Sequence, residues 1–139
     1  MYDKYYGDYW KIYLDRFQDR ETKQFIALKP GWTKFKDAED RVKFNHECFL
    51  KGKEPDSFLN HYDVKCIWSL PVKSTWERDY LESFMLEWFG EKKDLGFYTS
   101  GSTEVRKYDQ VKVNKWLSKP KERIQKWLEQ ESKESMHLL

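Results

Sequence analysis

The sequence has few of the residues that build metal clusters or disulfide frameworks. It contains two cysteines, Cys48 and Cys66, no C-x-x-C pair and three histidines in 139 residues. This content excludes a zinc cluster and argues against a disulfide scaffold. The chain also has no run of about 18 apolar residues, the length that a membrane-spanning helix needs. Its opening residues, MYDKYYGDYW, are too polar for a secretory signal, and we therefore expect a cytoplasmic protein without membrane contact.

An excess of charge of one sign is also missing. The chain has 26 lysines and arginines and 24 acidic residues, which gives a net charge of +2. This balance argues against phosphate binding by bulk positive charge, so any contact with nucleic acid must come from a local patch. What the chain does have is an 18% content of aromatic residues and enough length for one domain with a real core.

Residue patterning predicts strands and helices in alternation. The predicted strands cover residues 9–17, 23–29 and 63–72, where apolar and polar residues alternate. Pro30 and Gly31 are expected to end the second strand before a loop. The predicted helices cover residues 37–51, 75–89, 109–117 and a final segment that opens at Ser118. Ser74 and Glu77 form a capping-box pattern at the start of the second helix.

This order of elements predicts a small α/β (α+β) domain. We expect a three-stranded, mostly antiparallel sheet with flanking helices, followed by C-terminal helices. Residues 1–106 would form the core, and residues 107–139 would be a helical extension of the same domain.

Two charged residues interrupt the apolar faces of the first two predicted helices. Arg41 falls inside the apolar arc of the first, where it either covers the edge of the core or faces a cleft that receives an anion. Glu82 lies between Leu86 and Phe89 on the second. A carboxylate there requires a partner, either an arginine in an ordinary ion pair or a metal ion.

Two polar residues of the predicted hairpin complete this set. Tyr13 and Lys29 point to the same face of the sheet if the strands pair in the simplest register. Such a pair is suited to binding phosphate and moving protons. The ordinary interpretation is that Tyr13 packs in the core and Lys29 protects a strand edge.

The motifs, taken in order, resemble those of the GIY-YIG nuclease superfamily, and more closely its small phage-type branch. Lys11, Ile12 and Tyr13 resemble the first motif. The segment LKPGWTK, residues 28–34, resembles the branch form of the second motif, in which a lysine replaces the tyrosine before the glycine.

Three further motifs extend the resemblance over about residues 9–106. Arg41 stands at the helix position of the family's arginine. Leu81 and Glu82, followed by the apolar residues Met85, Leu86 and Phe89, resemble the helix that carries the family's metal-binding glutamate. The segment STEV, residues 102–105, resembles a Thr-Glu motif that closes the domain in the same branch.

The resemblance implies a metal-dependent endonuclease that hydrolyses phosphodiester bonds in DNA, either a stand-alone enzyme of a phage or mobile element or a restriction-like enzyme. In this reading Glu82 holds Mg²⁺ or Mn²⁺, hard cations that prefer oxygen ligands. Arg41 binds the scissile phosphate and stabilises its developing charge. Tyr13, or as the second choice Lys29, takes the proton from the attacking water.

The resemblance also assigns supporting roles. Lys34 would contact a phosphate of the DNA. Gly31 keeps the glycine of the second motif, and Glu104 would orient Arg41 or a metal-bound water.

A basic stretch near the C-terminus offers a further DNA contact. It combines cations with two tryptophans, Trp116 and Trp127, and comprises Lys112, Lys115, Lys119, Lys121, Arg123 and Lys126. Lys115, Lys119, Lys121 and Arg123 are the candidate phosphate contacts. Two interpretations stay open for this stretch: a solvated amphipathic helix that packs on the core, or a helix that contacts DNA or forms a homodimer.

Two other functions also stay open. In one, the chain is a catalytically inactive GIY-YIG-like protein that binds a nucleic acid or a host protein without hydrolysing DNA. In the other, it has a purely structural role, if Tyr13, Lys29, Arg41 and Glu82 fail to meet around one cleft.

Overall fold

The computed structural model describes residues 6–35, 61–95 and 102–137 and confirms a mixed α+β fold. The strands form an antiparallel sheet in the order β3-β1-β2-β4. They are β1 (Tyr6–Asp19), β2 (Phe25–Phe35), β3 (Tyr62–Val72) and β4 (Arg106–Lys107). The helices are α2 (Thr75–Phe89), α3 (Gln110–Leu117) and α4 (Lys121–His137), with a short 3₁₀ helix η3 (Ser102–Glu104) before β4.

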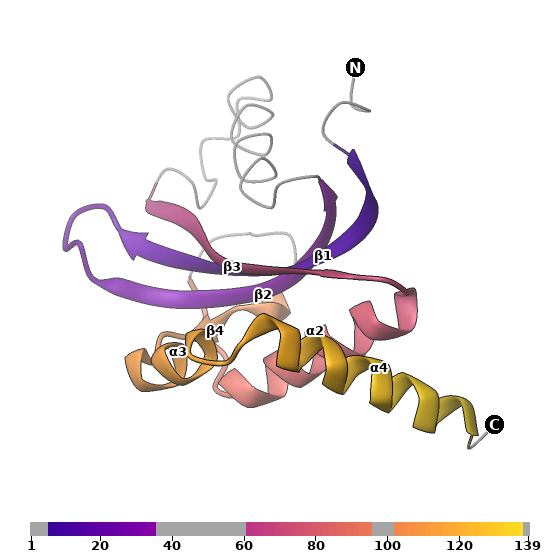
Figure 1. Cartoon of the computed structure of the whole chain (residues 1–139). Coiled ribbons are helices and arrows are strands. Elements are labelled where there is room, and N and C mark those ends of the chain that lie inside the picture. The colour runs from indigo at the N-terminus through magenta and orange to yellow at the C-terminus, as the bar shows by residue number, and fades with distance from the viewer. Residues whose placement is uncertain (1–5, 36–60, 96–101, 138–139) are drawn as a thin grey trace.

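The three α-helices lie on one side of the sheet (Figure 1). Helix α2 crosses the strands, and α3 and α4 follow from the β4 edge. The predicted helix over residues 37–51 lies outside the described residues, and so does Arg41. No helix in the described ranges is long and apolar enough to span a membrane.

The expected end of the second strand at Pro30 and Gly31 is wrong. Strand β2 continues through both residues to Phe35 and stays paired with β1. In the part of the chain that the structure describes, β4 pairs with β2 only at Ala27 and Leu28, so β2 has a strand partner on one side alone at Pro30. Proline is tolerated at such edge positions because no ladder bond is required of its missing N–H.

The expected three-stranded sheet is also wrong, because β4 adds a fourth strand beside β2. Two residues are too few for an alternating pattern to mark them in the sequence. The strand lies across the predicted boundary between residues 106 and 107. Helices α3 and α4 insert Val113, Trp116, Ile124 and Leu128 into the same core as the sheet, so the extension and the sheet share one core.

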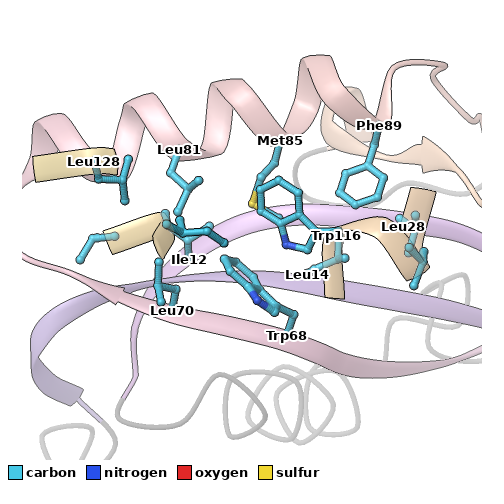
Figure 2. Close-up of a cluster of buried hydrophobic side chains, with 13 residues drawn as sticks. Ile12, Leu14, Leu28, Trp68, Leu70, Leu81, Met85, Phe89, Trp116 and Leu128 are labelled. Atoms are coloured by element: carbon cyan, nitrogen blue, oxygen red, sulfur yellow. The ribbon is translucent and has the colours of Figure 1, made fainter. Parts of the chain in front are cut away.

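That core lies between the sheet and the helices. Figure 2 shows Leu81, Met85 and Phe89 pointing from α2 toward the sheet, with Ile12 and Leu14 of β1 below them. The spacing of four residues puts the three α2 side chains on one helix face. All five are nearly inaccessible to water, and their burial is the main term that stabilises the fold.

The start of α2 offers a test of the capping box. The side chain of Ser74 accepts a hydrogen bond from the backbone N–H of Glu77 at 3.1 Å. We expect Ser74→Ala to lower the free energy of unfolding by about 1 kcal/mol, since an N–H at the helix start loses its acceptor. Ser83→Ala, the same change at an exposed position in α2, is the control and should be neutral. Urea denaturation measures both, and equal midpoints would contradict the role of Ser74.

Candidate functional site

The β1–β2 register brings Tyr13 and Lys29 together. Tyr13 pairs with Gly31 and Asp15 pairs with Lys29, so these side chains share one face of the sheet. The Nζ of Lys29 donates a hydrogen bond to the Oη of Tyr13 at 3.2 Å. Both side chains are buried. A hydroxyl and an ammonium group therefore meet in a setting largely shielded from water.

Gly31 makes this meeting possible through its lack of a side chain. A Cβ atom on Gly31 would lie 2.3 Å from the Oη of Tyr13 and 2.4 Å from its Cζ. The tyrosine ring therefore occupies the space above Gly31. The glycine serves close packing in the middle of a strand, where the sequence predicted a turn.

Glu104 reaches the same ammonium group from another element. Its Oε2 lies 3.4 Å from the Nζ of Lys29. Glu104 ends η3, and the buried side chain of Arg106 fixes that turn. Its Nη1 donates to the carbonyl of Thr103 at 2.6 Å, and its Nε donates to the carbonyl of Leu86 in α2 at 3.1 Å. Arg106 thus joins α2 to η3, a role that sequence reasoning missed.

Glu82 approaches the site from α2, where it is half-buried. Burial is the largest cause, and the negative charge of Glu104 the second, of a rise in the pKa of Glu82 from 4.5 to about 7. The positive charge of Lys29 acts in the opposite direction. These influences on one carboxyl group indicate that Glu82, Glu104 and Lys29 lie near one another.

The sequence left open an ordinary ion pair between Glu82 and an arginine, and the described residues around Glu82 do not form one. Arg78, one turn earlier in α2, pairs with Asp79, its Nε 2.8 Å from Oδ1. Among the described side chains none forms an ion pair with Glu82. Glu82 and Glu104 therefore place two carboxyl groups of like charge in one neighbourhood with a single ammonium group.

Asp15 adds a carboxyl group that sequence reasoning also missed. It is almost completely buried and lies directly across from Lys29 in the β1–β2 register. The sequence signal that could have identified it is an acid two residues after Tyr13, on the same face of the strand. Asp15 and Lys29 are therefore direct neighbours on the site's face.

The other predicted residues that the structure describes form no hydrogen bond or ion pair with this group. Lys34 is exposed on β2, with its Nζ 4.3 Å from the centre of the Trp10 ring. Four cations, Lys115, Lys119, Lys121 and Arg123, are exposed on α3, on α4 and between them. No hydrogen bond or ion pair within residues 6–35, 61–95 and 102–137 joins those four to the site.

The tryptophans of the basic stretch belong to the core or pack against it. Trp116 is fully buried, and Trp127 packs against the rings of Tyr80 and Phe84. Ile124 and Leu128 of α4 are buried with them. The contacts of this stretch are those of an amphipathic helix packed on the core, and Trp116 has no surface on which a base could stack.

The donor set fits a hard divalent cation. Within the described residues no group of three or more His, Cys, Asp or Glu side chains is placed to hold a metal. Magnesium in proteins commonly takes one or two carboxylates and completes its shell with water and substrate phosphate. Glu82 and Glu104 supply that number, and the positive charge of a bound cation would act against the rise in the pKa of Glu82 that burial and then the charge of Glu104 cause.

Comparison of the chain with protein-family models, with curated proteins and with solved structures gives no match.

Proposed function

We propose that the protein is a divalent-metal-dependent endonuclease that hydrolyses phosphodiester bonds in DNA. One observation carries the proposal: the ammonium group of Lys29 contacts both Tyr13 and Glu104, and Glu82 of α2 is near enough for the charges of Glu104 and Lys29 to affect its pKa. The resemblance of the motifs to GIY-YIG nucleases supports the same chemistry.

Each side chain has a role in this reaction. The ammonium group of Lys29, 3.2 Å from the Oη of Tyr13, would stabilise the deprotonated form of that oxygen, which is the form able to take a proton from the attacking water. Glu82 would hold Mg²⁺ or Mn²⁺, with Glu104 as a second oxygen donor. When bound, the ion supplies positive charge near the departing oxygen. Arg41, outside the described residues, would bind the scissile phosphate.

The proposal predicts cleavage that depends on both the metal and Lys29. Supercoiled plasmid should be nicked in the presence of Mg²⁺ or Mn²⁺ and left intact in EDTA. Lys29→Met should slow the nicking by about 100-fold, because Tyr13 loses the cation beside its oxygen.

Lys65→Met is the matched control, since Lys65 is an exposed lysine on β3, and it should leave the rate unchanged. Cleavage that survives in EDTA, or that Lys29→Met leaves intact, contradicts the proposed site. DNA binding without cleavage in the wild-type protein would favour the inactive binding protein.

A further inference from the structure

An exposed tryptophan lies beside the candidate site. Trp32 follows Gly31 in β2, and 41% of its surface is exposed. Among the Phe, Trp and Tyr side chains that the structure describes it alone is exposed, although these residues make up 18% of the chain. A fold that buries or half-buries its other described rings leaves this one in water, which points to a contact outside the chain.

Trp32 belongs to a group of four side chains, which we call the tryptophan cluster: Trp10, Trp32, Lys34 and Arg78. The rings of Trp10 and Trp32 meet edge to face with their centres 4.8 Å apart. The guanidinium carbon of Arg78 lies 4.3 Å from the centre of the Trp32 ring and 4.4 Å from that of Trp10. Contacts from β1 and α2 thus orient Trp32 before any ligand arrives.

The tryptophan cluster adjoins the candidate site through α2. In β2, Trp32 pairs with Ile12 and points to the face of the sheet that α2 covers, opposite the face of Tyr13 and Lys29. In α2, Arg78 precedes Glu82 by one turn, and its charge lowers the pKa of that carboxyl group. A strand whose phosphate reaches Glu82 would therefore lie about one helical turn from Arg78, which contacts Trp32.

The two cations of the cluster have different roles. Arg78 is mostly covered and its Nε is paired with Asp79 at 2.8 Å, so its charge is largely balanced and it serves to hold the rings. Lys34 is exposed, and no described carboxylate forms an ion pair with it. The ammonium group of Lys34 is thus available for a phosphate of the ligand.

We propose that the tryptophan cluster binds an unpaired nucleotide of a DNA strand, the base stacking on Trp32 and the phosphate meeting Lys34. Stacking requires a base whose face is not covered by its neighbours, which a single strand or an extruded nucleotide provides and a regular duplex does not. The net charge of +2 is too small for tight duplex binding by bulk charge. The inference rests on the proposed function only in taking DNA as the strand.

Binding without cleavage tests this inference. The full chain in EDTA is titrated against a fluorescein-labelled 12-nucleotide single strand and against a duplex of the same length, with anisotropy as the readout. The single strand should bind more tightly. Trp32→Leu should weaken its binding by about 10-fold, the usual effect of removing one stacking ring. Trp32→Phe should retain most of the affinity, because it keeps a ring.

Trp76→Leu is the matched control. Trp76 is a half-buried tryptophan of α2 that stacks on Tyr80, outside the tryptophan cluster, and its loss should leave the affinity unchanged. Equal affinity of Trp32→Leu and wild type, or a preference for the duplex, overturns the inference. Trp32-dependent binding by a protein that never cuts DNA would uphold it while the proposed nuclease activity failed.

Discussion

Replacing Glu82 with glutamine is expected to remove DNA cleavage and at the same time to stabilise the folded protein at pH 8. Glutamine keeps the size of the side chain but cannot carry the negative charge that a divalent cation requires. We expect cleavage to fall by about 10²- to 10³-fold, the usual effect of losing one charged group that stabilises the transition state. The rate loss and the stability gain have the same origin. The negative charge of Glu82, which the cation requires, destabilises the fold because the side chain is half-buried.

The sign of the stability change follows from the pKa of Glu82, which burial and the charge of Glu104 raise from 4.5 to about 7. Between these two pH values the folded state holds a proton that the unfolded state has lost, so stability falls as the pH rises through this window. The shift corresponds to about 3 kcal/mol, and partial exposure of Glu82 reduces the effect to about 1–2 kcal/mol. Glutamine removes this cost above pH 7.

Urea denaturation at pH 8 and at pH 4, without added metal, measures the stability part of the prediction. Glu82→Gln should be more stable than wild type at pH 8 and equal to it at pH 4. Glu87→Gln, the same change at an exposed position of α2, should alter neither stability nor cleavage. A loss of stability in Glu82→Gln at pH 8 would show instead that Glu82 forms an ordinary ion pair.

Local sequence patterns predicted the parts of this fold that local interactions determine. Helix α2 begins at Thr75 and ends at Phe89 as predicted, because Ser74 caps it and its apolar residues repeat at helical spacing. Strand β3 begins one residue before its predicted start and ends at Val72 as predicted. These elements carry their signals within a few neighbouring residues.

The errors arose where a distant partner decides the outcome. Pro30 and Gly31 have the composition of a turn, and only pairing with β1 keeps them in a strand. Strand β4 consists of two residues placed by their contact with β2. In both places pairing with a distant strand overrides the local conformational preference. The pairing of β2 with β1 and β4 cannot be derived from the neighbouring residues in the sequence.

In the candidate site, too, some contacts follow from local sequence patterns and others depend on segments far apart in the chain. Tyr13 and Lys29 share a face because strands alternate, which the sequence pattern contains. The approach of Glu104 to Lys29 depends on η3 and on Arg106, whose hydrogen bonds reach back to Leu86 in α2. These contacts join segments far apart in the chain. The resemblance of the motifs therefore indicated Glu104 as a site residue, but local sequence patterns did not predict that it would pair with Lys29.

Gly31 is the residue through which the fold and the candidate site depend on each other most directly. The Oη of Tyr13 lies 2.3 Å from the position that a Cβ on Gly31 would occupy. The hydroxyl is the far end of the side chain, but Tyr13 is only 3% exposed, so close packing leaves the ring little room to move aside. Its hydrogen bond with Lys29 would break if it did.

Gly31→Ala is therefore expected to lower the free energy of unfolding by about 2–3 kcal/mol, the usual cost of overpacking a buried site. Tyr13→Leu removes the ring, and in that background Gly31→Ala should cost less than about 0.5 kcal/mol, because Gly31 lacks a positive φ and alanine fits an extended strand. Urea denaturation of the four proteins gives a coupling energy of about 2 kcal/mol.

Gly90→Ala is the control for this cycle. Gly90 has a φ of 80° at the end of α2, so alanine there is destabilising for a backbone reason unrelated to Tyr13. Its cost should be the same in the wild-type and Tyr13→Leu backgrounds. If Gly31→Ala also costs the same in both, the tyrosine ring does not lie against Gly31, and the geometry that joins Tyr13 to Lys29 is wrong.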